Sequence, residues 1–434
     1  MSLMSRKLSA SPSWVLAVYA SLFLFVTYTC CYAYRKPFSV GLYEGETLWG
    51  FDVKLLYVMA EIVGYAVSKF IGVLLVPGMK RNLRGWYAVG LMSFSELALA
   101  GFGFLPGGWK VLSILLAGLP LGMIWGILFS YIEGRKVSEM LNVGISVALI
   151  TSSGIVKSLG RWVLDVFPVG DYWMPSVTGA LCYPLMLLSV WLLCQVPEPT
   201  EADRAARTER VPMSRGECLS FLRQFMGGIV MLLVFYGGLT VFRELRDSFA
   251  AEIWSEAGVS GSMVFTYSEL PICLIVLGLM FSLSFVRSNR WAVNSIYGIS
   301  MLGALLMVCS TWLYSHGSLS TMWWMVLAGL GMYMGYVPFS FLLDRLIARL
   351  RVVGTVVFLL CLADSVGYLG TAGVFVVKNF SRMDIPWTDM LVHTAYIVGT
   401  LSLVLVFFIF RYFKRQILQI NGWGKDKQDK IEKQ

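Results

Sequence analysis

Charged residues are scarce in this chain, since Asp, Glu, Lys and Arg make up 14% of its 434 residues while hydrophobic residues make up 57%. A soluble protein carries roughly a quarter charged residues, and a mean hydropathy of +0.70 also argues against one. Histidine is almost absent, because only His316 and His393 occur and they lie far apart in the sequence. A histidine-rich metal or catalytic site is therefore not expected.

The eight cysteines follow no zinc-binding or disulfide spacing, and all but Cys218 fall in apolar runs. No metal and no cofactor are expected, and the lack of a nucleophile–base pair or metal cluster argues against a membrane enzyme. The net charge is +9, but Lys and Arg concentrate in alternate loops and form no patch with interleaved aromatics. Nucleic acid is thus not an expected partner.

Apolar segments of about 20 residues fill the chain, which is the length a membrane-spanning helix needs. The sequence predicts an all-α polytopic membrane protein, embedded in a lipid bilayer as a monomer. Its twelve transmembrane helices are predicted at residues 14–36, 53–76, 85–105, 110–132, 140–163, 172–195, 222–246, 263–286, 291–313, 320–343, 352–377 and 388–412.

The distribution of basic residues predicts the orientation, because Lys and Arg are enriched in cytoplasmic loops. With the N-terminus inside, the inner loops hold ten of these residues and the outer loops only four, namely Lys54, Lys110, Lys378 and Arg382. Both termini are then cytoplasmic, and the first apolar run is read as a retained helix. We expect a multi-pass protein of the cell membrane, in a bacterium the inner membrane.

The two halves of the chain are similar in sequence. Ala117-Gly118-Leu119 and Phe129-Ser130 are matched by Ala328-Gly329-Leu330 and Phe339-Ser340, about 210 residues later. Such agreement predicts two pseudo-symmetric six-helix halves, an architecture used by secondary transporters. The predicted domains are residues 1–196, a cytoplasmic linker at 197–221, residues 222–413, and a disordered cytoplasmic tail at 414–434.

Several cations lie in or at the ends of the apolar segments, where a charge costs at least ~2.5–3.5 kcal/mol unless it faces a wet cavity or a partner. Arg35 and Arg243 occupy corresponding places in the two halves, so we expect them on opposite sides of one cavity. Arg35 could instead extend to the outer headgroups, and Arg246 is a rival to Arg243, with Glu244 and Asp247 available to pair with both. The predicted substrate-binding cations are Arg35, Lys36, Lys69, Lys157 and Arg243.

Four acids in the apolar segments could carry protons or serve as structural counter-ions, and the sequence leaves both readings open. They are Glu61, Glu96, Glu269 and Asp364. A further set of charges, at cytoplasmic helix ends, is predicted to act in gating. It comprises Arg81, Arg84, Asp344 and Arg345.

Twelve helices in two halves with a long central loop resemble the major facilitator superfamily. Within it, Arg35-Lys36-Pro37-Phe38 and the Ser68-Lys69-Phe70 motif look like those of the organophosphate:phosphate antiporters. That resemblance implies a phosphate site made by Arg35 and Arg243 and assisted by Lys69. The chain departs from that family in the 140–163 helix, where it has Ile150-Thr151-Ser152-Ser153 instead of a histidine, so it resembles a divergent branch.

The expected function is secondary active transport of a small anionic solute by alternating access. An organophosphate or sugar phosphate, exchanged for phosphate, fits the resemblance. Two alternatives stay open: symport of another organic anion with H⁺, and a sensor that has a transporter fold but moves no solute.

Overall fold

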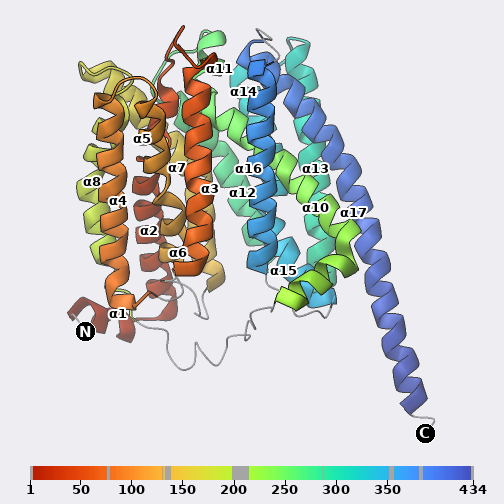
Figure 1. Ribbon diagram of the computed structural model, residues 1–434. Coiled ribbons are helices and arrows are strands. Elements are labelled where there is room, and N and C mark those ends of the chain that lie inside the picture. The colour runs from red at the N-terminus through yellow and green to blue at the C-terminus, as the bar shows by residue number, and fades with distance from the viewer. Residues whose placement is uncertain are drawn as a thin grey trace. The chain divides into compact units, whose positions relative to one another are not determined.

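The computed structural model describes residues 3–75, 79–129, 131, 138–197, 215–286, 288–350, 356–380 and 385–431. Helices make up nearly all of this described chain (Figure 1). Up to residue 197 they are α1 (Leu3–Ala10), α2 (Ser13–Tyr32), the 3-10 helix η1 (Pro37–Val40), α3 (Val53–Leu75), α4 (Arg81–Phe104), α5 (Trp109–Gly118), α6 (Leu121–Phe129), α7 (Ser138–Val166) and α8 (Met174–Leu193). After residue 214 they are α10 (Arg215–Ser248), α11 (Ala250–Glu256), α12 (Val264–Ser284), α13 (Asn289–Ser315), α14 (Thr321–Tyr336), α15 (Phe339–Leu350), α16 (Val356–Phe380) and α17 (Trp387–Ile431).

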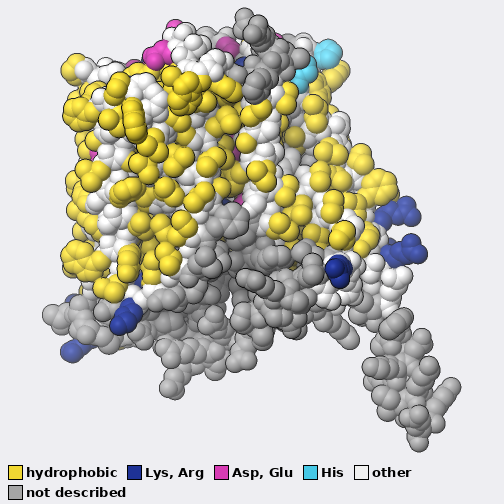
Figure 2. All heavy atoms as spheres, viewed as in Figure 1, with side chains coloured by type: hydrophobic (Ala, Val, Ile, Leu, Met, Phe, Trp, Pro, Cys, Tyr) yellow, Lys and Arg dark blue, Asp and Glu magenta, His cyan; other side chains and the backbone are white. Residues whose placement is uncertain are grey.

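The predicted all-α membrane class is confirmed. Within the described residues, ten segments are long and apolar enough to cross a membrane, and each coincides with a predicted span. The other two predicted spans, 53–76 and 352–377, overlap α3 and α16. Figure 2 shows hydrophobic side chains over most of the visible helical surface, as contact with lipid requires.

The chain divides into two compact units. Unit 1 consists of residues 1–208, 245–277 and 372–388, and unit 2 of residues 209–244, 278–371 and 389–434. Four helices, α10, α12, α16 and α17, contribute residues to both units. The boundaries 1–196, 197–221 and 222–413 read from the sequence stay a prediction.

Small residues allow the helices of unit 1 to pack closely. In unit 1, α2 packs against α7 and α8, and α3 packs against α5 and α6. A Cβ placed on Gly118 would lie 3.0 Å from the Glu61 carbonyl oxygen, and one on Gly122 would lie 2.8 Å from the Lys69 amide nitrogen. Glycine at these positions lets the backbones approach, and so fixes where α3 holds its charged side chains.

The main packing in unit 2 is between α13 and α14. Here too glycines face each other, since a Cβ on Gly303 would lie 2.5 Å from the Gly331 carbonyl oxygen. Both glycines are buried, and neither leaves room for a side chain. The backbones of the two helices therefore touch here.

Proline and glycine explain where the structure departs from the predicted spans. Helix α2 ends at Tyr32, and Arg35 and Lys36 lie in the turn before η1 rather than in the helix. Pro37, which has no backbone N–H to continue α2, stands at the first position of η1. The 110–132 span is divided at Pro120 into α5 and α6. A hairpin of β1 (Thr47–Leu48) and β2 (Phe51–Asp52) was not predicted; its turn places Trp49 and Gly50 at φ +55° and +78°.

Helix α17 continues through Ile431, into the segment 414–434 for which the sequence predicts disorder. The residues after Arg411 include many strong helix formers and no proline, so nothing in the sequence ends the helix near residue 414.

Candidate functional site

Arg35 is buried, with only 5% of its surface exposed, and its Nε donates to Glu61 Oε1. Glu61 and Tyr65 lie one turn apart on α3, so both face the turn that follows α2. The Arg35 guanidinium carbon is 3.9 Å from the centroid of the Tyr65 ring. The predicted cation thus turns inward in unit 1, with Glu61 and the rings of Tyr65 and Tyr32 among its partners, and does not extend to the headgroups.

Lys36 and Lys157 share one carboxylate, that of Asp247. Lys36 Nζ is 2.8 Å from Asp247 Oδ2, and Lys157 Nζ pairs with Oδ1 and also donates to the Asp247 carbonyl oxygen. Ser153, one turn before Lys157 on α7, donates to the same carboxylate over 2.5 Å. Both lysines are almost fully buried, so this cluster of Lys36, Lys157, Ser153 and Asp247, here called the lysine cluster, holds two cations and one anion.

Two further buried ion pairs lie in unit 1. Arg246 Nη1 donates to Glu269 Oε1 over 2.6 Å, and Lys54 Nζ pairs with Glu252 while donating to the Ser39 carbonyl oxygen over 2.7 Å. Lys54 was assigned to an outer loop from the sequence, yet it is 2% exposed. Burial raises the pKa of Glu252, and the nearby Lys54 opposes that rise.

Lys69 and Glu96 have quite different surroundings in unit 1. Lys69 is half-buried, with its Nζ 5.0 Å from the centroid of the Tyr65 ring. Glu96 Oε1 accepts a hydrogen bond of 2.7 Å from Ser176 on α8, away from the lysine cluster's partners. The structure therefore groups Lys69 with the Arg35 surroundings through Tyr65.

Arg243 belongs to unit 2 and lies among tyrosines. It donates to Glu244 over 2.5 Å, to the Tyr336 hydroxyl, and to the Tyr368 hydroxyl over 3.4 Å. Its guanidinium carbon is 4.6 Å from the centroid of the Tyr336 ring. Asp364, also in unit 2, accepts a hydrogen bond of 2.9 Å from Tyr236.

The predicted gating charges differ in their surroundings. Arg345 donates to Asn289 over 2.6 Å, whereas Asp344 is exposed. Arg84 is half-buried near the start of α4, and the side chain of Arg81 lies outside the described part of the molecule.

The partners of Asp247 were not found from the sequence. The sequence left open a pairing with Arg243 or Arg246, and the structure shows Asp247 bound to two lysines, one after α2 and one on α7. The spacing of Ser153 and Lys157 showed that they share a face of a helix; nothing in the sequence showed that Asp247 lies against that face. Among the described residues, no group of three or more His, Cys, Asp or Glu side chains is arranged to hold a metal ion.

Residues 37–416 match the model of a family described as a family of unknown function (DUF5690). The chain belongs to this family. No curated protein matches its sequence.

The fold of this DUF5690 chain is similar to those of several solved structures. The nucleoside transporter NupG is 14% identical, with 92% of this chain and 99% of that chain covered at a TM-score of 0.63. A D-xylose-proton symporter is 15% identical, with 93% and 98% covered at a TM-score of 0.61. The xylose transporter XylE from E. coli, in an inward-open conformation, is 13% identical, with 92% and 96% covered at a TM-score of 0.59. This DUF5690 chain therefore has the major facilitator fold.

Proposed function

We propose that the chain is a secondary active transporter that moves a small anionic solute by alternating access. The solute class that we propose is an organophosphate or sugar phosphate, exchanged for phosphate. The observation that carries this proposal is the lysine cluster, in which two buried ammonium groups share the single carboxylate of Asp247.

The charge balance of the buried pairs supports an anionic rather than a neutral solute. Arg35, Lys54 and Arg246 pair with Glu61, Glu252 and Glu269 respectively, whereas Lys36 and Lys157 both pair with Asp247. An anion that approaches these two buried ammonium groups gains charge-assisted hydrogen bonds of the stronger kind. Binding of the anion would also release Asp247 from one or both lysines.

That exchange of partners offers a physical reason for coupling. A carrier moves its solute only when the solute binds the two conformations with different free energy. An anion that replaces Asp247 on the lysines would remove a link between η1, α7 and the end of α10, and so favour rearrangement of the loaded protein. Exchange for phosphate then needs no proton.

The resemblance to organophosphate:phosphate antiporters supports the same solute class, through Arg35, Lys36 and Lys69. The major facilitator fold supports transport, since the nucleoside transporter NupG and the D-xylose-proton symporter share it. The contributions of Lys69 and Arg243 to substrate binding stay predictions, as do the roles of Glu96 and Asp364 and those of the gating charges Arg81, Arg84, Asp344 and Arg345.

Uptake of labelled glycerol-3-phosphate into proteoliposomes preloaded with phosphate tests the function. We expect uptake by the unaltered chain, and a loss of ~10-fold or more in Lys36→Gln and in Lys157→Gln, since a hydrogen bond to a charged group contributes about 1.5–3 kcal/mol. Lys7→Gln, at an exposed lysine of α1, is the matched control and should transport normally.

The opposite results would discard the proposal. Binding without uptake would identify a sensor, and equal uptake of neutral xylose or a nucleoside would show that the lysines do not select an anion. Retained exchange in both lysine variants would remove the lysine cluster from the binding role.

Proton-coupled symport of an organic anion is the second candidate. It is favoured by the buried carboxylates of Glu61 and Glu269, each of which has one oxygen, Oε2, without a hydrogen-bond partner in the described chain. If a proton is carried, an inward proton gradient without internal phosphate drives uptake, and Glu61→Gln or Glu269→Gln abolishes that stimulation. Uptake that depends only on internal phosphate would exclude this coupling.

A further inference from the structure

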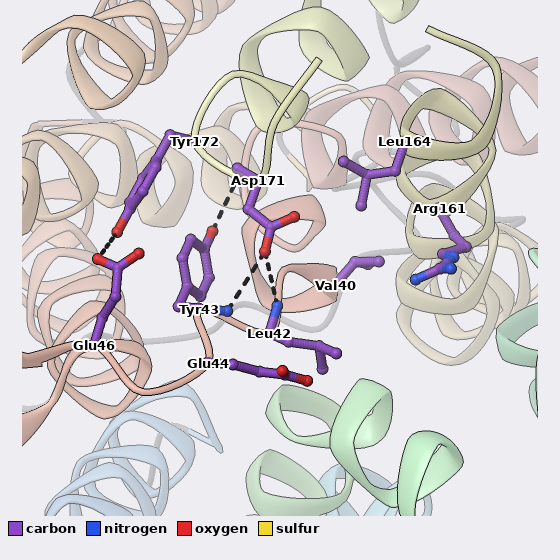
Figure 3. Close-up of a pocket in the computed structure, with 9 residues that line it drawn as sticks. All are labelled: Val40, Leu42, Tyr43, Glu44, Glu46, Arg161, Leu164, Asp171 and Tyr172. Carbon is purple, nitrogen blue, oxygen red and sulfur yellow. Dashed lines mark hydrogen bonds between the residues drawn. The ribbon is translucent and has the colours of Figure 1, made fainter. Parts of the chain in front are cut away.

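Unit 1 contains an open pocket of about 440 Å³ that is separate from the lysine cluster (Figure 3). Its size falls within the ~300–1,000 Å³ typical of small-molecule sites. Three segments form it: the residues after η1, the last turns of α7 and the loop before α8. The lining residues are Val40, Leu42, Tyr43, Glu44, Glu46, Arg161, Leu164, Asp171 and Tyr172.

Hydrogen bonds hold the floor of the pocket in place. Asp171 Oδ2 accepts the backbone N–H of Leu42 over 3.1 Å and that of Tyr43 over 3.4 Å. The Tyr43 hydroxyl donates to the Phe38 carbonyl oxygen over 3.0 Å, and the Tyr172 hydroxyl donates to Glu46. Burial raises the pKa of Tyr43, and the nearby Asp171 raises it further, so this hydroxyl stays protonated and remains a donor. These contacts occupy Glu46 and one oxygen of Asp171.

Two charges of opposite sign reach the pocket without pairing with each other. Figure 3 shows the Arg161 guanidinium and the Glu44 carboxylate entering from different sides, with no bond between them. Glu44 makes no hydrogen bond or ion pair to any described residue, and Asp171 Oδ1 is likewise without one. Among the described residues, Arg161 pairs only with Asp165, at 3.2 Å and outside the pocket, and both side chains are more than 40% exposed. An exposed pair of this kind contributes little, so Arg161 is available to a ligand.

The walls between these charges are apolar. Val40, Leu42 and Leu164 line the pocket beside Arg161 (Figure 3). A ligand that fits has a cationic end, an anionic end and a short aliphatic body. Neither a simple anion nor a simple amine would satisfy both charges.

We propose that this pocket binds a small aliphatic zwitterion of the α-amino acid type. Its ammonium group lies against Glu44 and Asp171 Oδ1, its carboxylate lies against Arg161, and its side chain lies against Val40, Leu42 and Leu164. With the predicted orientation, the three segments belong to outer loops or helix ends, so this ligand arrives from outside the cell. This second site has no residue in common with the lysine cluster.

Isothermal titration of the full-length purified chain in detergent tests the site, with L-leucine as the probe. Two analogues each lack one charge: 4-methylpentanoate has no amino group, and 3-methylbutylamine has no carboxylate. We expect L-leucine to bind at least tenfold more tightly than either analogue. Equal affinity for an analogue, or no binding of L-leucine at concentrations up to tens of millimolar, would overturn the proposal.

Single substitutions assign the binding to this pocket. Glu44→Gln and Arg161→Gln should each weaken L-leucine binding at least fivefold, because each removes one of the two charges. Asp165→Asn is the matched control, since it removes a neighbouring carboxylate that does not line the pocket and should leave affinity the same or higher. Glu44 and Asp165 are exposed and the Arg161 side chain is 42% exposed, so the variants should fold. Glycerol-3-phosphate exchange should be unchanged in them. Leucine binding that is unaffected by both Glu44→Gln and Arg161→Gln would place the ligand elsewhere and refute the site.

Discussion

Asp247 stabilises two lysines that come from different parts of the chain. Lys36 follows α2 and Lys157 lies on α7, and both are almost fully buried. Removing the Asp247 carboxylate takes an ion-pair partner from both buried lysines, and breaking a buried ion pair in this way typically costs about 3–5 kcal/mol. The stability of unit 1 therefore depends on this side chain more than on any exposed ion pair, such as Arg161–Asp165.

Asp247→Asn should lower the free energy of unfolding by about 3 kcal/mol and the Tm by several degrees. Thermal unfolding of the purified protein, followed by intrinsic tryptophan fluorescence, measures the change. The double variant Lys157→Met/Asp247→Asn should recover part of the lost free energy of unfolding, because it also removes one of the two lysines that pair with Asp247. An Asp247→Asn protein as stable as the unaltered one would show that the lysines are compensated by other groups.

The kinds of residue in the site could be predicted from the sequence, but not their partners. Arg35, Lys36 and Lys157 were recognised because a cation in an apolar segment is costly, and that cost applies wherever the partner is. Asp247 lies about 90 residues from Lys157, and no local spacing relates the two. The burial of Lys54 was missed for a similar reason, since its position near a helix end gave no sign that Glu252 covers it.

At the level of helices, α13 and α14 can pack closely because glycine, which has no side chain, stands where they meet. A Cβ on Gly303 would lie 2.5 Å from the Gly331 carbonyl oxygen and 2.8 Å from Met334 Cβ. A real Cβ cannot lie so close to backbone, so even one methyl group must push the two helices apart.

Gly303→Ala should therefore destabilise the protein by about 1–3 kcal/mol, despite the higher helix propensity of alanine. Gly298→Ala is the matched control on the same helix, because nothing lies within 4 Å of a Cβ there; it should be neutral or stabilising by up to ~1 kcal/mol. Thermal unfolding of both variants gives the comparison. Equal behaviour of the two alanines would mean that α13 and α14 do not touch at Gly303.

Long apolar runs gave the spanning helices, because hydrophobic length is a property of the sequence itself. Short elements were missed: α1, α11 and the β1–β2 hairpin are each too brief for periodicity to reveal. The hairpin had a local signal in Trp49-Gly50, since glycine suits the left-handed conformation that a two-residue turn needs. The division at Pro120 also had a signal, in proline itself, although the apolar run continues through it.

For the molecule as a whole, the distribution of Lys and Arg among the loops predicts the orientation in the bilayer. The inner-loop excess of Lys and Arg predicts that the residues after η1 face outward and the linker at 197–221 faces the cytoplasm. The same orientation places the zwitterion pocket outside, so one measurement bears on both.

Cysteine labelling in intact cells tests this orientation. In a chain whose eight native cysteines are replaced, Glu44→Cys should react with a membrane-impermeant maleimide in intact cells. Ala206→Cys, in the linker, should react only after the cells are broken. The reverse pattern would invert the topology and place the pocket inside.

The backbone of Tyr43 bears on how the zwitterion pocket binds a ligand. Its backbone is in the left-handed region, at φ +51°, a conformation that costs a bulky residue about 1–2 kcal/mol. Asp171 and burial of the Tyr43 ring hold this conformation. Its free-energy cost is therefore part of folding and does not reduce the free energy of ligand binding. The loop that lines the pocket is then already ordered, so ligand binding does not lose free energy by ordering it. Loss of the Asp171 carboxylate would let the loop around Tyr43 change conformation. We then expect the binding pocket to be lost as a whole, rather than its affinity for the ligand to fall gradually.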